Sequence, residues 1–210
     1  MVGFEKLKYI WTVGILYLFG LASSIFLTIN SFFLFDWSIK FDQLSETVGM
    51  SGKLIKHNYL QLLSYLELPW INKLKMQSFN SSPHGLEHMR EVKQLFLLNS
   101  VILLILIVLL FLTWRSLNKS QEWWKYYGVM KWSYLVPLVA SGLILINFDQ
   151  FFIMFHRILF RNNYWIFDPS LDPVINILTD NFFMACFLMG LIYFELFIGL
   201  INWKIKRTLD

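Results

Sequence analysis

The chain has 210 residues and a formal net charge of +4, and 57% of its residues are hydrophobic. Only 15% are charged, against roughly 25% in soluble domains, and the mean hydropathy is +0.53. A soluble domain of this size cannot hide so much apolar surface, because its own surface must be largely polar. We therefore predict a single membrane domain over residues 1–210, and the charge forms no basic stripe of the kind that binds nucleic acid.

Four apolar stretches are long enough to cross a bilayer, which takes roughly 20 residues. They cover residues 9–31, 95–114, 132–148 and 181–203. The third contains Pro137 and Gly142, which membrane helices tolerate because neighbouring helices satisfy the freed backbone groups. A signal peptide would also begin with a basic flank, but the first apolar run is longer than the usual signal core. We expect an all-α integral membrane protein with four transmembrane helices.

The distribution of lysine and arginine predicts the orientation of the four helices. The N-terminus, the loop between the second and third spans and the C-terminus carry nine basic residues and three acidic ones. The other nine basic residues lie in the two remaining loops, where ten acids balance them. Lysine and arginine concentrate on the cytoplasmic side, so we expect both termini in the cytoplasm and the two remaining loops outside.

The first outer segment, residues 32–93, is long enough to form a small extracytoplasmic cap. Residues 53–68 carry apolar side chains at helical spacing and stop before Pro69, which predicts an amphipathic helix on the membrane surface or on the bundle. Ser82 and Pro83 then have the pattern of an N-cap and a first helical residue. We expect the helix that begins there to run straight into the second span.

The second outer segment, residues 149–180, forms a long loop. Its first part, 149–160, is expected to extend the third helix. The Asn-Asn pair at 162–163 and the Asp-Pro pair at 168–169 predict turns. A second Asp-Pro pair, at 172–173, has the pattern of a helix start that leads into the fourth span.

All four histidines lie in the two outer segments, at His57, His84, His88 and His156. His88 comes just before the second span and His156 just after the third, so a helical bundle can bring them to one depth. Imidazole titrates near neutral pH and both accepts and donates a proton, as acid–base catalysis requires. The alternative is that these histidines are interfacial side chains without a catalytic role.

The run HGLEH at residues 84–88 also matches the zinc pattern H-x-x-E-H. His84 and His88 would lie one helical turn apart and could bind one metal, with His156 as third ligand and Glu87 as base. That interpretation gives a metal-dependent membrane hydrolase, although the surrounding fold of a metallopeptidase is not evident. A third interpretation is a non-catalytic membrane adaptor whose cap binds a partner.

Two stretches resemble a known family. Residues 79–99, FNSSPHGLEHMREVKQLFLLN, resemble its segment F-S…H-M/F-x-D/E-V-K-x-L-F. Residues 148–183, FDQFFIMFHRILFRNNYWIFDPSLDPVINILTDNFF, resemble its segment F-H-x-x-F-F-x-N-x-x-W-x-x-D-P…D-x-L/V-I. The family is the lipoprotein intramolecular transacylases of Gram-positive bacteria. Thr179-Asp180 departs from the Pro-Glu pair expected there, at the entry of the fourth span.

The resemblance implies an acyltransferase reaction in the bacterial cell membrane, with the active site at the outer face of a multi-pass protein. The substrate would be a diacylated bacterial lipoprotein. The sn-2 acyl chain of its diacylglyceryl-cysteine would move to the α-amino group of that cysteine, which gives a lyso-form lipoprotein. The implied reaction requires no cofactor, metal or second lipid.

The resemblance also implies roles for the histidines. It places His88 and His156 at the family's histidine positions, and His84 at a position that varies. We assign His156 as general base and His88 as acid and oxyanion partner, and the reverse assignment stays open.

Six further residues are expected to support the two histidines. Three carboxylates could orient an imidazole: Glu91, Asp149 and Asp168. Three other side chains could donate hydrogen bonds or shape the pocket: Asn163, Tyr164 and Trp165. The aromatic residues around His156 suit a pocket for acyl chains, and a water-poor pocket disfavours hydrolysis.

Overall fold

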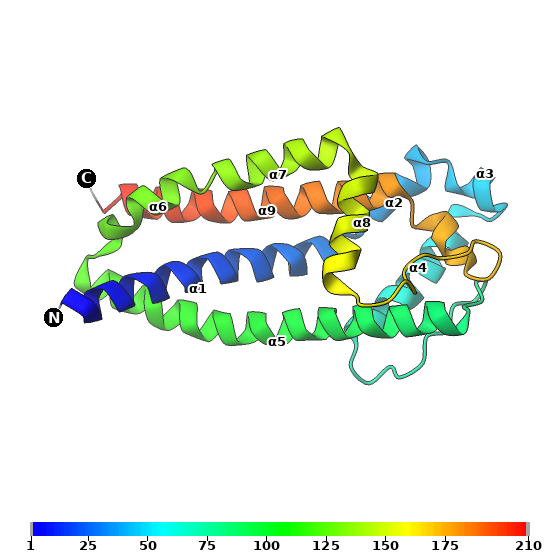
Figure 1. Cartoon of the computed structure of the whole chain (residues 1–210), viewed down its shortest axis with the longest axis horizontal. Coiled ribbons are helices and arrows are strands. Elements are labelled where there is room, and N and C mark those ends of the chain that lie inside the picture. The colour runs from blue at the N-terminus through cyan, green and yellow to red at the C-terminus, as the bar shows by residue number, and fades with distance from the viewer. Residues whose placement is uncertain (1, 209–210) are drawn as a thin grey trace. The chain divides into compact units, whose positions relative to one another are not determined.

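The computed structural model describes residues 2–208, and the elements in this part of the chain are all helices (Figure 1). Four helical stretches are long and apolar enough to cross a membrane: Gly3–Ile29, Pro83–Ser120, Trp123–Ile146 and Asp180–Lys206. The predicted fold class, an all-α membrane protein with four transmembrane helices, is confirmed.

The chain folds as two compact units. Unit 1 contains Met1–Asn30, Asn99–Gly142 and Leu188–Asp210, and unit 2 contains Ser31–Leu98 and Leu143–Phe187. The second, third and fourth of the long helical stretches therefore each contribute one part to unit 1 and another part to unit 2.

Unit 1 is a helical bundle with an apolar exterior. It comprises α1 (Val2–Ile29), most of α5 (Pro83–Ser120), η1 (Trp123–Tyr126), α6 (Tyr127–Trp132), most of α7 (Leu135–Ile146) and most of α9 (Asp180–Lys206). Side chains such as Leu104, Val108 and Phe111 on α5 are more than half exposed. Lipid covers such surfaces in a membrane protein, since helices that are apolar on every side are otherwise buried.

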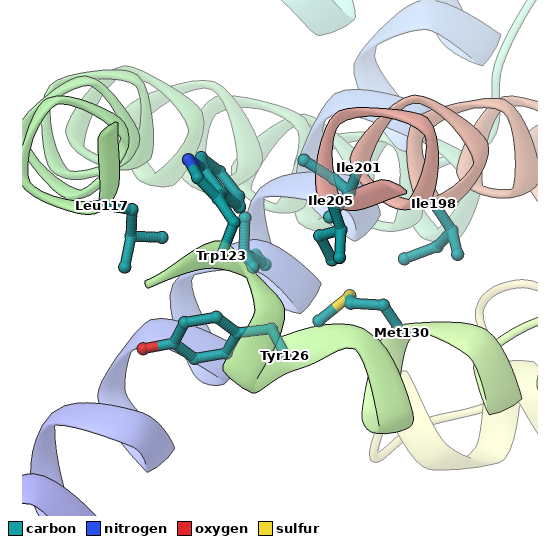
Figure 2. Close-up of a cluster of buried hydrophobic side chains, with 8 residues drawn as sticks. Leu117, Trp123, Tyr126, Met130, Ile198, Ile201 and Ile205 are labelled. Atoms are coloured by element: carbon teal, nitrogen blue, oxygen red, sulfur yellow. The ribbon is translucent and has the colours of Figure 1, made fainter. Parts of the chain in front are cut away.

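A buried cluster holds the helices of unit 1 together (Figure 2). Its members come from α1, α5, η1, α6 and α9, and they are Leu16, Leu117, Trp123, Tyr126, Met130, Ile198, Ile201 and Ile205. The indole of Trp123 is anchored by a hydrogen bond from Nε1 to Asn118 Oδ1 of 2.8 Å, because a buried indole N–H needs an acceptor.

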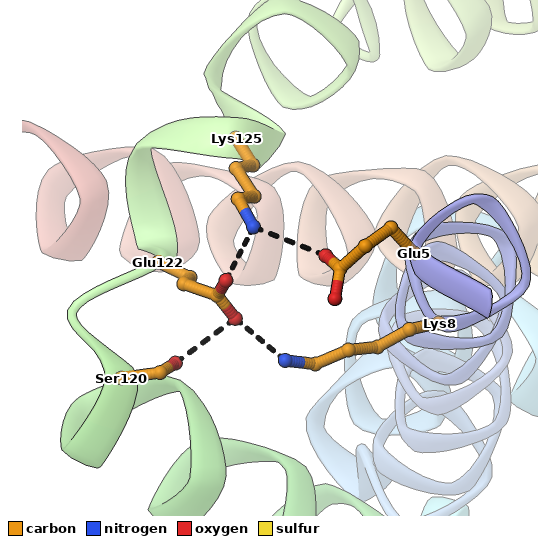
Figure 3. A network of polar contacts seen from close by, with 5 residues as sticks. All are labelled: Glu5, Lys8, Ser120, Glu122 and Lys125. Atoms are coloured by element: carbon orange, nitrogen blue, oxygen red, sulfur yellow. Dashed lines mark hydrogen bonds and ion pairs between the residues drawn. The ribbon is translucent and has the colours of Figure 1, made fainter. Parts of the chain in front are cut away.

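The turn between the second and third spans is fixed by a polar network (Figure 3). Glu122 accepts hydrogen bonds from Lys125, from Lys8 at 2.6 Å and from Ser120 at 3.1 Å. Lys125 also reaches Glu5 on α1, at 3.3 Å. The bonds from Lys125 and then Lys8 lower the pKa of Glu122 to about 2, so this carboxylate stays charged and keeps the turn attached to α1.

The third span is interrupted near its middle. Helix α6 ends at Trp132 and α7 begins at Leu135, just before Pro137. Proline has no N–H to donate to the carbonyl four residues back, which here belongs to Ser133. The stretch long enough to span runs over Trp123–Ile146, whereas the sequence suggested 132–148.

Unit 2 contains the segment expected to form the cap together with the long loop. It comprises α2 (Phe32–Phe41), α3 (Leu44–Val48), α4 (Gly52–Glu67), the start of α5, the end of α7, α8 (Phe148–Leu159), η2 (Pro173–Ile177) and the start of α9. The predicted amphipathic helix is present as α4, whose apolar face is buried within the unit. There Tyr59 stacks on Phe35 at 3.8 Å, and Phe182 packs edge-on against both rings.

The predicted start of α5 at Pro83 is confirmed. Ser82 Oγ accepts a hydrogen bond from the Gly85 N–H at 2.9 Å, as an N-cap does. Asp172, buried at 4% exposure, accepts from the Ser82 N–H at 2.7 Å and from its hydroxyl at 2.6 Å. A Cβ at position 85 would lie 2.7 Å from Asp172 Cγ, so glycine makes room for this carboxylate. The first turn of α5 is thereby fixed in place.

Residues 149–160 do not extend the third helix, so that prediction is wrong. Helix α7 ends at Ile146, and Asn147 leaves helical geometry with φ −155° and ψ 87°. The Asn147 side chain accepts a hydrogen bond from Gln150 N at 3.1 Å and so caps a new helix. Helix α8 is therefore separate from α7, and its last turn places His156 next to His88, near the start of α5 within unit 2.

Candidate active site

The structure brings His88 and His156 together within unit 2. His88 lies near the start of α5 and His156 in the last turn of α8. Their ring centroids are 6.0 Å apart, and the two residues are 6% and 9% exposed. The pair is therefore enclosed and close enough to act on one substrate, while the catalytic roles remain a prediction.

A hydrogen bond sets the tautomer of His156. Its Nδ1 lies 2.8 Å from the backbone carbonyl oxygen of Phe152. A carbonyl can only accept, so Nδ1 carries the proton and Nε2 keeps a free lone pair. Burial lowers the pKa of His156, although the bond to Phe152 raises it in part. At neutral pH this imidazole is therefore neutral and able to accept a proton at Nε2.

His88 faces a carboxylate. Its Nδ1 lies 3.9 Å from Oε2 of Glu91, one helical turn further along α5. Both atoms are buried and neither has a hydrogen-bond partner. The distance is too long for a hydrogen bond, but catalytic hydrogen bonds in substrate-free structures are often long and shorten when substrate binds. Two facing groups without partners are thus poised to pair.

Asn162 connects Glu91 to the loop that follows α8. Its Nδ2 donates to Glu91 Oε1 at 2.8 Å, and its Oδ1 accepts from the Tyr164 N–H at 3.0 Å. The backbone carbonyl of Asn162 accepts from Trp165 Nε1, also at 3.0 Å. The ring of Trp165 packs against His156, with centroids 4.8 Å apart. One asparagine therefore positions both a carboxylate near one histidine and an aromatic ring against the other.

Asn163, the neighbouring asparagine predicted from the sequence to support the site, does not hold Glu91. That side chain is exposed, and the residue bonds through its backbone carbonyl, which accepts from Ile166 N at 3.1 Å. The family motif N-x-x-W supplied the missing signal, because three residues before Trp165 is position 162.

Asp149 and Asp168 do not reach the histidines. Asp149 is exposed in the first turn of α8. Asp168 is exposed and accepts hydrogen bonds from the Ser170 hydroxyl and N–H, which lower the pKa of this carboxyl. Asp168 therefore stabilises the turn at 168–171. Of the three predicted orienting carboxylates, Glu91 is the one that the structure places beside an imidazole.

Aromatic rings enclose both imidazoles. Phe160 packs edge-on against His88 with centroids 4.7 Å apart, and Phe167 does so at 5.6 Å. Phe152 contacts the ring of His156 at 4.1 Å. Such surroundings keep water away and strengthen electrostatic interactions inside the site.

The HGLEH run does not form the three-ligand site that the hydrolase interpretation requires. His84 is exposed and its ring stacks on Tyr164 at 4.3 Å. Glu87 pairs with Arg90, at 3.0 Å from Nε. Within residues 2–208, no group of three His, Cys, Asp or Glu side chains is placed to hold a metal ion.

Comparisons with known proteins agree with the predicted resemblance. A solved in meso structure of the membrane-integral lipoprotein intramolecular transacylase Lit from Bacillus cereus is 21% identical. It superposes with a TM-score of 0.88 over 100% of this chain and 97% of that chain. A variant of that protein with a histidine replaced by arginine is 22% identical, with a TM-score of 0.82 over 98% of this chain and 93% of that chain. A second variant, with alanine in place of a histidine, is also 22% identical. It superposes with a TM-score of 0.84 over 99% of this chain and 94% of that chain.

The structural likeness, at these identities, shows a shared fold. A search of curated proteins finds no significant sequence match. The family model described as lipoprotein intramolecular transacylase Lit matches residues 10–183, which is most of the chain and includes both histidines and Asn162. The chain therefore belongs to the Lit family of lipoprotein intramolecular transacylases.

Proposed function

We propose that this chain moves the sn-2 acyl chain of a diacylglyceryl-cysteine to the α-amino group of the same cysteine. The substrate is a diacylated bacterial lipoprotein and the product is its lyso-form. The observation that carries the proposal is the enclosed pair His88 and His156, 6.0 Å apart, in a member of the Lit family.

The reaction needs one proton acceptor and one proton donor. The amine nitrogen attacks the ester carbonyl, forms the amide bond and loses a proton. The ester C–O bond breaks, and the glyceryl oxygen takes up a proton. No proton is gained or lost overall, so two imidazoles can complete the cycle.

The surroundings of the two histidines favour His156 as the base. Its Nδ1–H is held by Phe152, which leaves Nε2 to accept the amine proton. His88 has Glu91 beside Nδ1, and that carboxylate stabilises the imidazolium that His88 becomes when it receives the amine proton from His156. His88 then supports the oxyanion and protonates the departing glyceryl oxygen.

Proximity supplies much of the rate in a transfer within one molecule. The amine and the ester belong to the same lipid-modified cysteine, so the enzyme needs to hold one productive conformation. The rings of Phe152, Phe160 and Phe167 exclude water that would otherwise hydrolyse the ester.

The protein is proposed to lie in the bacterial cell membrane with both termini in the cytoplasm and the active site at the outer face. The density of lysine and arginine in the short segments of unit 1, including Lys8 and Lys125, supports this orientation. The site lies instead on segments where acids balance the basic residues. A fluorescent-protein fusion after Thr208 should fluoresce in cells, and alkaline phosphatase inserted after Asn72 should be active; the opposite pattern would reverse the orientation.

The activity can be tested with the full-length protein in detergent. The substrate is a synthetic diacylglyceryl-cysteinyl peptide with a free amine and an isotope-labelled sn-2 chain, and the product is read by tandem mass spectrometry. We expect the label on the cysteine nitrogen, and no product from the N-acetylated peptide. Added unlabelled peptide should not acquire the label, because the transfer is intramolecular.

Histidine variants assign the chemistry. His88→Ala and His156→Ala should each lower kcat by about 10²–10⁴-fold, the usual contribution of acid–base catalysis. His84→Ala should retain activity, since that side chain is exposed and stacked on Tyr164. Undiminished transfer by both of the first two variants, or release of labelled fatty acid as the main product, would overturn the proposal.

A further inference from the structure

A groove of about 410 Å³ lies on unit 2, and neither His88 nor His156 is among the residues that line it. One wall comes from α4 and the other from the loop that joins α4 to α5. The lining residues are His57, Leu60, Gln61, Ser64, Tyr65, Ile71, Lys73 and Lys75. None of them takes part in the proposed acyl transfer.

The loop that forms the second wall is anchored at both ends. At its start, the Leu68 N–H donates to Ser64 O at 3.0 Å. Near its end, Gln61 accepts from the Gln77 N–H at 2.8 Å. Asn58, which is fully buried, accepts from the Ser78 N–H at 2.8 Å. The groove is therefore preformed.

Lys93 fixes the depth of this loop along α5. Its ammonium donates to the carbonyl oxygens of Leu68 and Ile71, at 2.8 and 2.5 Å, and lies 4.6 Å from the ring centroid of Tyr65. The apolar stretch of α5 begins two residues after Lys93. The loop therefore lies where this helix passes from water into the hydrocarbon region. Trp70, 72% exposed beside the groove, suits the headgroup level, which tryptophan prefers.

The charge of the groove is positive and uncompensated. Lys73 and Lys75 form no ion pair with a carboxylate in the described part of the chain, and His57 adds a further polar group. Leu60 and Ile71 provide apolar surface next to these cations. Cations beside apolar surface, at headgroup depth, match a ligand with an anionic head and a hydrocarbon tail.

We propose that this groove binds the headgroup of an anionic membrane phospholipid. The phosphate lies near Lys73 and Lys75, and the glyceryl and acyl carbons lie against Leu60 and Ile71. An acidic peptide would meet the same cations but would not require the apolar surface or the depth that Lys93 sets. A zwitterionic headgroup would place its own cation beside the two lysines.

Lipid retention on the full-length protein tests this proposal. Purified protein is titrated with dioleoylphosphatidylglycerol or dioleoylphosphatidylcholine in detergent, and native mass spectrometry measures the lipid that stays bound. Each lysine near an anionic lipid contributes about a fivefold effect, so Lys73→Gln/Lys75→Gln should bind phosphatidylglycerol about 30-fold more weakly. The matched control Lys40→Gln/Lys53→Gln changes exposed lysines of unit 2 that do not line the groove, and it should bind as the wild type does.

A charge-preserving variant separates recognition from folding. Lys73→Arg/Lys75→Arg should retain the binding that the glutamine variant loses. The proposal is overturned by equal retention in the glutamine variant and the wild type, or by equal losses in both glutamine pairs. Equal binding of the two lipids, or displacement of the lipid by inorganic phosphate or a soluble acidic peptide, would also overturn it. Acyl transfer is measured separately, so this result does not depend on the proposed reaction.

Discussion

Substitution of Gly85 by alanine should disturb the start of α5 and, through it, His88. The added Cβ would lie 2.7 Å from Asp172 Cγ and 3.1 Å from Oδ2, far inside van der Waals contact. Asp172 is held by two hydrogen bonds from Ser82 and is 4% exposed, so it has little freedom to move aside. Either the carboxylate leaves Ser82 or the first turn of α5 shifts.

The loss in the free energy of unfolding follows from the two hydrogen bonds between Ser82 and Asp172. A hydrogen bond to a charged group contributes about 1.5–3 kcal/mol, and the substitution removes one or both. Alanine offsets up to about 1 kcal/mol because glycine is the poorer helix former. We expect Gly85→Ala to lower the free energy of unfolding by about 0.5–5 kcal/mol. Transfer should slow by up to about 100-fold, since a displacement of about 1 Å at a catalytic group can have that effect.

Thermal unfolding in detergent and the mass-spectrometric transfer assay measure both effects. Gly14→Ala is the matched control, because nothing lies within 4 Å of its added Cβ, and its midpoint should stay the same or rise. In the background of Asp172→Ala the clash is gone, so adding Gly85→Ala should cost nothing further. If Gly85→Ala is equally destabilising with and without Asp172, the steric explanation is refuted.

Four other predictions concern the site and its supports. Asn162→Ala should lower kcat, whereas Asn163→Ala should not, because the first side chain holds Glu91 at 2.8 Å and the second is exposed; equal effects would contradict this assignment. Glu91→Gln should lower kcat about 10–100-fold, the kinetic equivalent of a charge-assisted hydrogen bond, with KM little changed. Burial lowers the pKa of His156, so initial rates, normalised to the free-amine fraction of the substrate, whose α-amino pKa is about 8, should hold as pH falls to 6.5 and decline only below it; a normalised decline centred above 6.5 would exclude His156 as a neutral base. Lys93→Met removes the donor to two loop carbonyls, so trypsin should cleave the loop at residues 73–75 faster than in the wild type, and unchanged cleavage would show that Lys93 does not hold it.

The membrane fold was predictable from the sequence because the bilayer imposes a local rule. A stretch of about 20 apolar residues by itself predicts a helix that lies in the bilayer, independently of the remainder of the chain. Helix capping also depends on neighbouring residues in the sequence, so Ser82 and Pro83 predicted the start of α5 without any tertiary information. The two family motifs likewise predicted that His88 and His156 belong to one site, because each motif contains one of the family's histidine positions.

Tertiary structure decided which neighbouring groups serve the site. Asn147 ends α7 and caps α8, and α8 places His156 beside His88 near the start of α5. Asn162 rather than Asn163 holds Glu91, and Asp172 holds the N-cap Ser82 of α5 from a segment 90 residues away in sequence. These contacts join distant segments, so helical periodicity and capping patterns do not encode them, and only the family motif N-x-x-W marked Asn162. The apolar runs thus determined that the chain spans a membrane four times, while long-range hydrogen bonds decided which polar side chains meet at the histidines.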